Sequence, residues 1–127
     1  MIKGIDYPEW YSQESLDTVL RGYVFENETP KQMYQRLAKT LSLRYADMLS
    51  KTSTTVTNQW DPLQMESVWF DYMWKGWLSP ASPLLSNLGT TRGFPISCFG
   101  LRIADNTYDI FTKVREMSIL TKYGGGK

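Results

Sequence analysis

The sequence contains no histidine and only one cysteine, Cys98, among its 127 residues. Histidine is the commonest general base and metal ligand near neutral pH, so its absence excludes both of these uses. A single cysteine also excludes an internal disulfide framework and a cysteine-based zinc site. Any chemistry of this chain must therefore use Cys98, carboxylates, hydroxyls or backbone groups, or a group that another chain supplies.

Excess charge and long apolar runs are lacking as well. Lys and Arg number 14 and Asp and Glu number 13, which leaves a formal net charge of +1. This balance gives no electrostatic signature of binding to DNA, RNA or an anionic membrane. No apolar run approaches the roughly 20 residues that cross a bilayer, and no signal peptide opens the chain. We expect a soluble, cytoplasmic protein without a nucleic acid or a membrane as partner.

Helical patterns account for most of the first 75 residues. Ser12 is a predicted N-cap for a short helix whose apolar residues recur at i, i+3, i+4 and i+7. Thr29, Pro30 and Gln32 form a capping-box start for a helix that runs to about residue 50. Asp61 repeats this start before a helix over residues 62–75. The faces predicted to be buried on these last two helices are Met33, Leu37, Ala38, Leu41, Tyr45, Met48 and Leu49, then Met65, Val68, Trp69, Tyr72 and Met73.

The remaining sequence predicts loops, one strand and one further helix. Residues 51–59 are polar and residues 79–95 contain three prolines and two glycines, so both stretches are expected to be irregular. Residues 96–103 are apolar and partly β-branched, which is typical of a buried strand. Such a lone strand needs pairing groups from elsewhere. Asn106 or Thr107 begins a last helix, which ends before glycines 124–126, and its predicted face is Ile110, Phe111, Val114, Met117 and Thr121.

The densest motif is the window from Ser79 to Cys98, SPASPLLSNLGTTRGFPISC. It resembles a signature of ribonucleotide reductase catalytic (large, alpha) subunits. In that family an S-P-x-[ST]-P-x-[LM]-S-N-x-G loop leads through an R-G step into Ser-Cys on the first barrel strand. The features that follow in the family are an Asp-Ser or Asp-Asn step, a helix and a glycine-rich turn, and they match residues 105–106, 110–120 and 122–126.

The resemblance implies a mainly α fold with one or two short strands. Residues 1–77 would form an N-terminal helical region. Residues 78–127 would supply the first strand and helix of the family's ten-stranded α/β barrel, which this chain leaves incomplete. The chain then resembles an N-terminal fragment of the large subunit.

The resemblance also assigns roles to single residues. Cys98 matches the first of two cysteines that supply reducing equivalents when the ribose 2′-hydroxyl leaves as water, and that become a disulfide. Ser82 matches a hydroxyl at the substrate phosphate, Ser97 a residue whose backbone meets the ribose, and Gly125 a turn that passes close to the substrate. Asp105 matches a carboxylate at the ribose of an allosteric effector nucleotide. Each residue also has an ordinary structural alternative. Cys98 could be a free cysteine packed as a small hydrophobe, and Asp105 a carboxylate favoured at a helix start. Ser82 could belong to a plain Ser-Pro turn, Ser97 could be an ordinary strand position, and Gly125 could belong to a frayed tail.

The implied activity is that of a ribonucleoside-diphosphate reductase large subunit, inactive without the remaining chain. This fragment would bind no cofactor or metal itself. A metal-containing small subunit, or alternatively adenosylcobalamin, would supply the radical, and thioredoxin or glutaredoxin the reducing equivalents. The other partners would be the remaining part of the catalytic subunit, the ribonucleotide substrate and the nucleotide effector.

Two other classes of function stay open. One is a non-catalytic helical module, derived from that subunit, that binds a protein partner through its aromatic surface. The other is a thiol enzyme in which Arg92 or Arg102 activates Cys98 electrostatically. The sequence also leaves open whether the substrate is a diphosphate or a triphosphate, and whether the fragment is a natural split-gene product.

Overall fold

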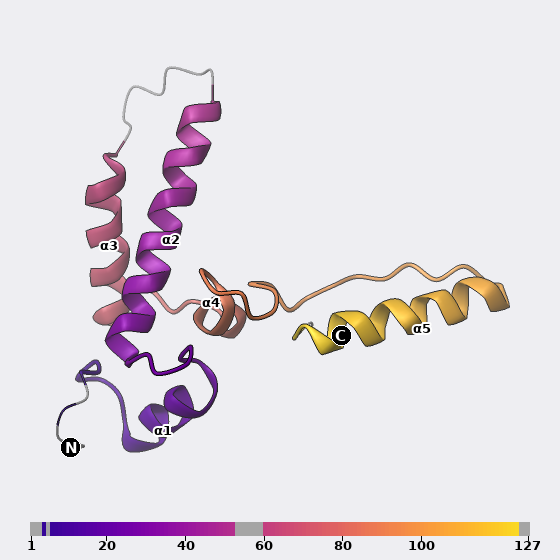
Figure 1. The fold of residues 1–127 in the computed structure, drawn as a ribbon, viewed down its shortest axis with the longest axis horizontal. Helices are drawn as coiled ribbons and strands as arrows, with labels where there is room; N and C mark the ends of the chain where they lie inside the picture. The colour runs from indigo at the N-terminus through magenta and orange to yellow at the C-terminus, as the bar shows by residue number, and fades with distance from the viewer. Residues whose placement is uncertain (1–3, 5, 53–59, 125–127) are drawn as a thin grey trace.

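Five helices make up most of the chain in the computed structural model, which describes residue 4, residues 6–52 and residues 60–124. They are α1 (Gln13–Gly22), α2 (Pro30–Lys51), α3 (Pro62–Trp74), α4 (Ser82–Asn87) and α5 (Thr107–Lys122). Helices α1 to α4 gather in one body around α2, whereas α5 and the extended segment before it project from this body as an arm (Figure 1). None of the described helices is long and apolar enough to cross a bilayer. The prediction of a mainly helical fold is confirmed.

The helices begin at the predicted caps. The Thr29 hydroxyl accepts a hydrogen bond from the backbone N–H of Gln32, and the Gln32 side chain accepts one from the backbone N–H of Thr29 at 2.8 Å. This reciprocal pair satisfies two N–H groups that a helix start otherwise leaves unpaired. The caps of the other three predicted helices are also confirmed: Ser12 for α1, Asp61 for α3 and Asn106 for α5.

Replacing Thr29 with Ala is expected to lower the free energy of unfolding by about 1 kcal/mol, because the Gln32 N–H loses its acceptor at the start of the longest helix. Urea denaturation followed by circular dichroism measures this difference. Thr18→Ala is the matched control, since the Thr18 hydroxyl bonds only the Glu14 carbonyl within α1 and caps nothing. An equal loss in both variants would contradict the capping role.

The hydrophobic core lies between α2 and α3, with one turn of α1 against it. Met33 and Leu37 of α2 and Met73 of α3 are fully buried. The predicted faces of α2 and α3 are therefore correct at these residues, but they are wrong at Met48 of α2 and Tyr72 of α3, which are 54% and 45% exposed. Tyr72 adjoins the buried Met73, but its ring lies against that of the exposed Trp77 instead of entering the core. The far half of α2 extends beyond α1 and α4 and has α3 alone beside it (Figure 1), so a side chain there has fewer neighbours to pack against.

Helix α4 corrects the prediction that residues 79–95 are irregular throughout. Pro83 lies in its first turn, where a missing N–H leaves no hydrogen bond unmade. The other end of this short helix is fixed from outside, because the Arg36 guanidinium donates to the carbonyl oxygens of Leu85, at 2.8 Å, and of Leu88. A contact 49 residues away along the chain thus stabilises a helix that local sequence does not predict.

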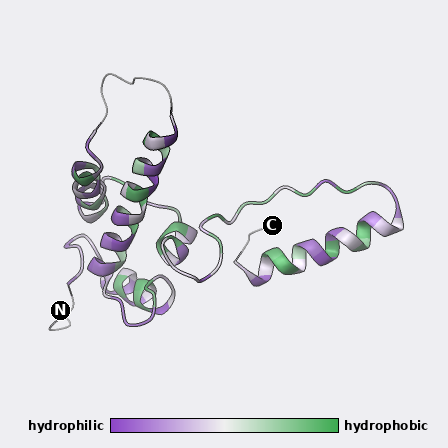
Figure 2. Cartoon of the chain, turned by 45° about the horizontal axis from the view of Figure 1, so that its top comes forward, coloured by the Kyte–Doolittle hydropathy of each residue, from purple (hydrophilic) through white to green (hydrophobic). Residues whose placement is uncertain are grey.

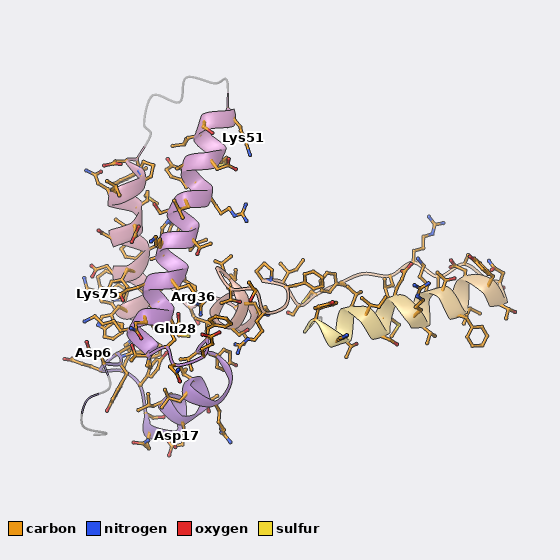
Figure 3. All side chains as sticks on the ribbon, in the orientation of Figure 1. Asp6, Asp17, Glu28, Arg36, Lys51 and Lys75 are labelled. Atoms are coloured by element: carbon orange, nitrogen blue, oxygen red, sulfur yellow. The ribbon has the colours of Figure 1, made fainter. Side chains whose placement is uncertain are left out.

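Arg36 also forms the least exposed ion pair of the described residues. The Arg36 Nε lies 2.8 Å from Oε1 of Glu28, and the Arg36 Nη2 lies 3.0 Å from Oε2. The two side chains are only 12% and 13% exposed. Glu28 in turn accepts a hydrogen bond from the Phe25 N–H at 3.0 Å. Both side chains point into the junction of α2, α4 and the loop before α2 (Figure 3). This pair therefore connects three segments of the body.

The predicted buried strand over residues 96–103 is not formed in the part of the chain that the structure describes. The segment is extended, and only Cys98 takes part in a single β-bridge. Ile96 and Ile103 are 56% and 53% exposed, so the prediction of burial is wrong. An extended segment becomes a strand only when neighbouring backbone completes its ladder, and no described segment does so.

Helix α5 forms as predicted, but its predicted apolar face is not covered. Phe111 and Val114 are 69% and 53% exposed, and apolar bands are visible along the arm in Figure 2. The predicted loop over residues 51–59 and Gly125 lie largely or wholly outside the described residues; Lys51 itself belongs to α2.

A hydrogen-bonded pair of tyrosines, Tyr34 in the core and Tyr11 packed against it, makes the free energy of unfolding depend on pH in the alkaline range. The hydroxyls of Tyr11 and Tyr34 lie 2.8 Å apart, and burial raises the pKa of both phenols above the ordinary value. An acid whose pKa is raised by folding stabilises the protein below its unfolded pKa, about 10 for Tyr, and loses that contribution as pH rises further. We expect the midpoint of urea unfolding to fall between about pH 9 and pH 11. The double variant Tyr11→Phe, Tyr34→Phe should show a smaller fall, and an unchanged pH dependence would contradict this origin.

Candidate functional site

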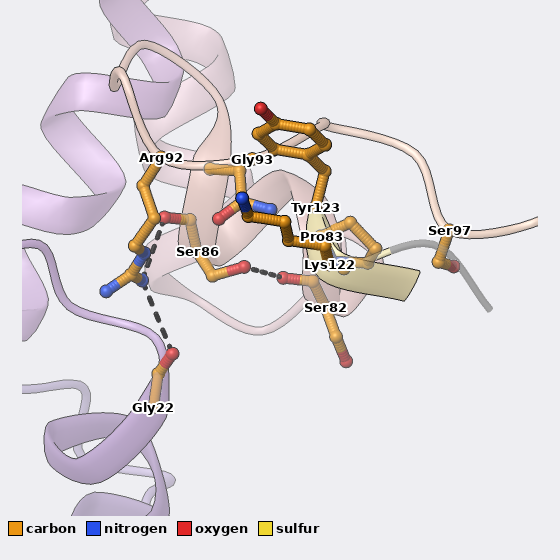
Figure 4. A pocket seen from close by; sticks show the side chains of 11 residues that line it. Gly22, Ser82, Pro83, Ser86, Arg92, Gly93, Ser97, Lys122 and Tyr123 are labelled. Atoms are coloured by element: carbon orange, nitrogen blue, oxygen red, sulfur yellow. Dashed lines mark hydrogen bonds between the residues drawn. The ribbon is translucent and has the colours of Figure 1, made fainter. Parts of the chain in front are cut away.

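Two of the three residues predicted at the substrate line one cavity of about 690 Å³. Ser82 comes from the start of α4 and Ser97 from the extended segment, and both face this cavity (Figure 4). Gly124, after the end of α5, also lines it, whereas Gly125 lies outside the described residues. The volume is within the range of small-molecule sites. The fold thus brings together two of the three predicted substrate residues, from positions 15 residues apart.

Two cations line the same cavity, and the sequence did not single them out as substrate residues. Arg92 donates to the carbonyl oxygens of Ser86 at 3.0 Å and of Gly22 at 3.4 Å, which fixes its guanidinium between α4 and the end of α1. Lys122 lies in the last turn of α5. No carboxylate is among the lining residues, so the electrostatics of the cavity favour an anion. The signal that could have revealed Arg92 is its place in the R-G step of the motif.

A close backbone approach at Gly93 brings the end of α5 to this cavity. Gly93 has a φ of +66°, and a Cβ there would lie 2.8 Å from the carbonyl oxygen of Tyr123, closer than real Cβ atoms come. The Phe94 N–H donates to that same oxygen at 3.2 Å, and the Asn87 side chain donates to the Phe94 carbonyl at 2.7 Å. Only glycine therefore suits position 93, which explains the second residue of the R-G step.

Cys98 is exposed and lies directly beside the cavity. Its sulfur is 3.9 Å from the hydroxyl of Ser97, which lines the cavity, although Cys98 does not line it itself. A thiol in this position is accessible to solvent and to another sulfur. The alternative of a cysteine packed as a small hydrophobe does not fit its exposure.

Asp105 is at the other end of the arm. It immediately precedes the N-cap of α5, whose C-terminal end reaches the cavity, and it is exposed. A helix of 16 residues is about 24 Å long, so Asp105 belongs to a location separate from the cavity.

No group of three or more possible His, Cys, Asp or Glu metal ligands gathers in the described residues.

The helical body and the cationic cavity together indicate a mainly α domain with a site suited to an anionic ligand. The family model for the all-alpha domain of ribonucleotide reductase matches residues 9–93, so the chain belongs to the ribonucleotide reductase large-subunit family. The resemblance to this family is thereby confirmed. The matched range contains Ser82, Arg92 and Gly93 and ends before Cys98 and Asp105.

Curated large subunits from viruses and a bacterium are similar over parts of the chain. A ribonucleoside-diphosphate reductase large subunit of Acanthamoeba polyphaga mimivirus is 30% identical over 99 residues, which are 78% of this chain and 10% of that protein. That of Invertebrate iridescent virus 3 is 42% identical over 57 residues, 45% of this chain and 9% of that protein. The alpha subunit of Helicobacter pylori is 33% identical over 69 residues, 54% of this chain and 9% of that protein. The chain thus spans about a tenth of the length of the relatives it matches.

Proposed function

We propose that this chain contributes the helical region, residues 1–77, and the start of the catalytic barrel, residues 78–127, to the reduction of ribonucleotides. The observation that carries the proposal is the cavity in which Ser82, Ser97 and Gly124 meet Arg92 and Lys122, with an exposed thiol beside it. The relatives are named ribonucleoside-diphosphate reductases, so we propose a ribonucleoside diphosphate as substrate. Gly125, next to a lining residue, would continue the turn along the substrate.

The cavity suits the diphosphate end of such a substrate. Ser82 would donate its hydroxyl to a phosphate oxygen, while Arg92 and Lys122 offset the negative charge. The Arg92 guanidinium is already oriented by three carbonyl oxygens, those of Gly22, Val24 and Ser86, which reduces the entropy lost on binding. The backbone of Ser97 would then meet the ribose, one residue before Cys98.

Cys98 would act as one of two reducing thiols. In the net reaction two thiols give two hydrogens, the C2′–O bond of the ribose breaks, the hydroxyl leaves as water, a C2′–H bond forms and the two sulfurs join as a disulfide. A disulfide needs its two Cα atoms within about 7 Å, and no second cysteine is present in these 127 residues. The second thiol and the radical-bearing cysteine would therefore come from the rest of the catalytic subunit.

The other proposed partners supply the radical and the reducing equivalents. A small subunit with a metal centre, or alternatively adenosylcobalamin, would generate the radical, and thioredoxin or glutaredoxin would reduce the disulfide after turnover. The described residues offer no cluster of metal ligands for such a centre, and we assign none of them to it. Asp105 would contact the ribose of a nucleotide effector, at a location separate from the substrate.

Reconstitution tests the proposal. The full chain is mixed with a polypeptide that carries the remaining barrel of a large subunit of this family, a small subunit and a thioredoxin system, and formation of deoxyribonucleoside diphosphate is measured by chromatography. Neither polypeptide alone is expected to turn over, and the mixture is expected to do so. Turnover by this chain alone, or a mixture that assembles without turnover, would overturn the proposal.

A non-catalytic interaction module is the second candidate function. The observation that favours it is the uncovered apolar surface of the arm, where Ile103, Tyr108 and Phe111 are 53%, 84% and 69% exposed. This surface suits a protein partner as well as it suits the rest of a barrel. Capture of a partner that lacks reductase cysteines, together with no effect of Cys98 substitution on any activity of the complex, would favour this candidate.

A further inference from the structure

A second cavity, of about 440 Å³, lies between α1, α2 and the connection from α3 to α4. Four aromatic side chains line it, Trp10, Tyr11, Tyr23 and Tyr34, together with the carboxylate of Glu14. It shares no lining residue with the cationic cavity. We infer that this aromatic cavity binds a small organic cation, an ammonium group with apolar substituents, through its rings and Glu14.

Trp10 forms a wall of this cavity that is fixed before any ligand arrives. Its indole N–H donates to the carbonyl oxygen of Trp74 at 2.8 Å, and its ring meets that of Tyr11 at 4.6 Å and 81°. A Cβ at Gly76 would lie 3.1 Å from the indole, so the ring lies directly over this glycine. The side chain is nevertheless 52% exposed. An exposed aromatic ring held in one orientation loses little entropy when it binds a ligand.

Glu14 determines the sign of the charge that the cavity accepts. It is the one charged side chain among the lining residues, and it takes part in none of the ion pairs of the described chain. Hydrogen bonds from its own backbone N–H and from Ser12 hold the pKa of its carboxyl below the ordinary value, so the group is ionised at neutral pH. The helix dipoles at the cavity oppose each other: the positive N-terminal end of α1 repels a cation, and the negative C-terminal end of α3, near Gly76, attracts one. The charge of Glu14 therefore decides whether the cavity favours a cation.

Aromatic rings together with a carboxylate form the chemistry that selects alkylated ammonium groups over neutral molecules of the same shape. The electron-rich faces of Trp and Tyr rings attract a cation, and the apolar substituents of the cation pack against the same rings. A neutral alcohol of equal size would keep the packing and lose the attraction. This difference separates a cation site from a mere apolar hollow.

The test compares choline with 3,3-dimethyl-1-butanol, its uncharged isostere, by titration of the full chain followed by NMR of the Trp indole N–H signals. We expect choline to shift the Trp10 signal saturably and the isostere to bind at least about tenfold more weakly. Glu14→Gln should weaken choline binding by about threefold, the effect of an exposed charge, and Trp10→Leu should abolish it. Equal affinity for the two probes, or unchanged affinity in Glu14→Gln, would overturn the inference.

Trp60→Phe is the matched control, because Trp60 is 60% exposed and does not line the aromatic cavity. It identifies the Trp60 signal and should leave choline affinity unchanged. Glu14 is exposed in the first turn of α1, so its substitution tests binding without disturbing the core. A second titration with the amide of Nα-acetyl-lysine distinguishes the source of the cation. Tighter binding than choline indicates a lysine side chain of a protein, and weaker binding indicates a free quaternary amine.

Discussion

Replacing Cys98 with Ser is expected to abolish turnover by the reconstituted reductase and to leave its assembly unchanged. A serine hydroxyl cannot form a disulfide, so the two electrons that the reaction needs have only one sulfur to come from. The side chain is exposed and packs in no core, so its loss removes no buried contact. Product formation is measured under multiple turnover, and complex formation is measured in parallel by size-exclusion chromatography.

Ser50→Ala serves as the control for the assay. Ser50 is an exposed residue near the end of α2, and its hydroxyl bonds only the Asp47 carbonyl. It does not line the cavity and is far in sequence from the residues that do. It should retain full turnover. In the isolated chain, Cys98 should also react with a disulfide reagent such as Ellman's without denaturant. Wild-type turnover by Cys98→Ser would remove the proposed redox role.

Replacing Arg36 with Met is expected to lower the free energy of unfolding by about 3 kcal/mol, the largest change in stability among these predictions. The substitution keeps a long apolar stem in α2 but leaves the Glu28 carboxylate, only 13% exposed, without its counter-charge. It also removes the donor to the carbonyl oxygens of Leu85 and Leu88 at the end of α4. Unpaired polar groups in low dielectric are costly, so the two losses act in the same direction.

Lys51→Met is the matched control on the same helix. Lys51 pairs with Asp47 at 2.8 Å, but the two side chains are 71% and 51% exposed, and such surface pairs contribute at most about 1 kcal/mol. Urea unfolding of both variants gives the comparison. A double variant with Glu28→Gln should recover part of the loss, because no charge is then left unpaired. A loss in Arg36→Met as small as that in Lys51→Met would show that the pair does not hold α4.

The first residues of four helices were predictable because the hydrogen bonds that cap them are local. Thr29 and Gln32 satisfy each other's backbone N–H within one turn, and Asn106 caps α5 by accepting from a residue three positions on. The sequence shows such pairs directly. Helix α4 was missed because its end is stabilised by Arg36, which lies far from it in the chain. The arm was predicted as a strand and a helix with a buried face, yet burial depends on a neighbour that local pattern does not contain.

The candidate site divides in the same way. The residue types, the spacing of Ser82 and Cys98, and the R-G step are properties of the sequence, and they carried the resemblance to the family that the comparisons confirm. The convergence of Ser82 and Ser97 with Lys122, and the anchoring of Arg92 on carbonyls of two helices, follow from packing alone.

The sequence by itself determined where four helices begin, which residues of α2 face the base of the core, and to which family the chain belongs. Each of these depends on side chains within a few positions of one another. The tertiary structure alone decided that α4 is a helix, that residues 96–103 stay extended and are not buried, and that two cations share a cavity with three serines. The physical reason is that burial, charge neutralisation and backbone pairing depend on distances in space between residues that are remote in the chain.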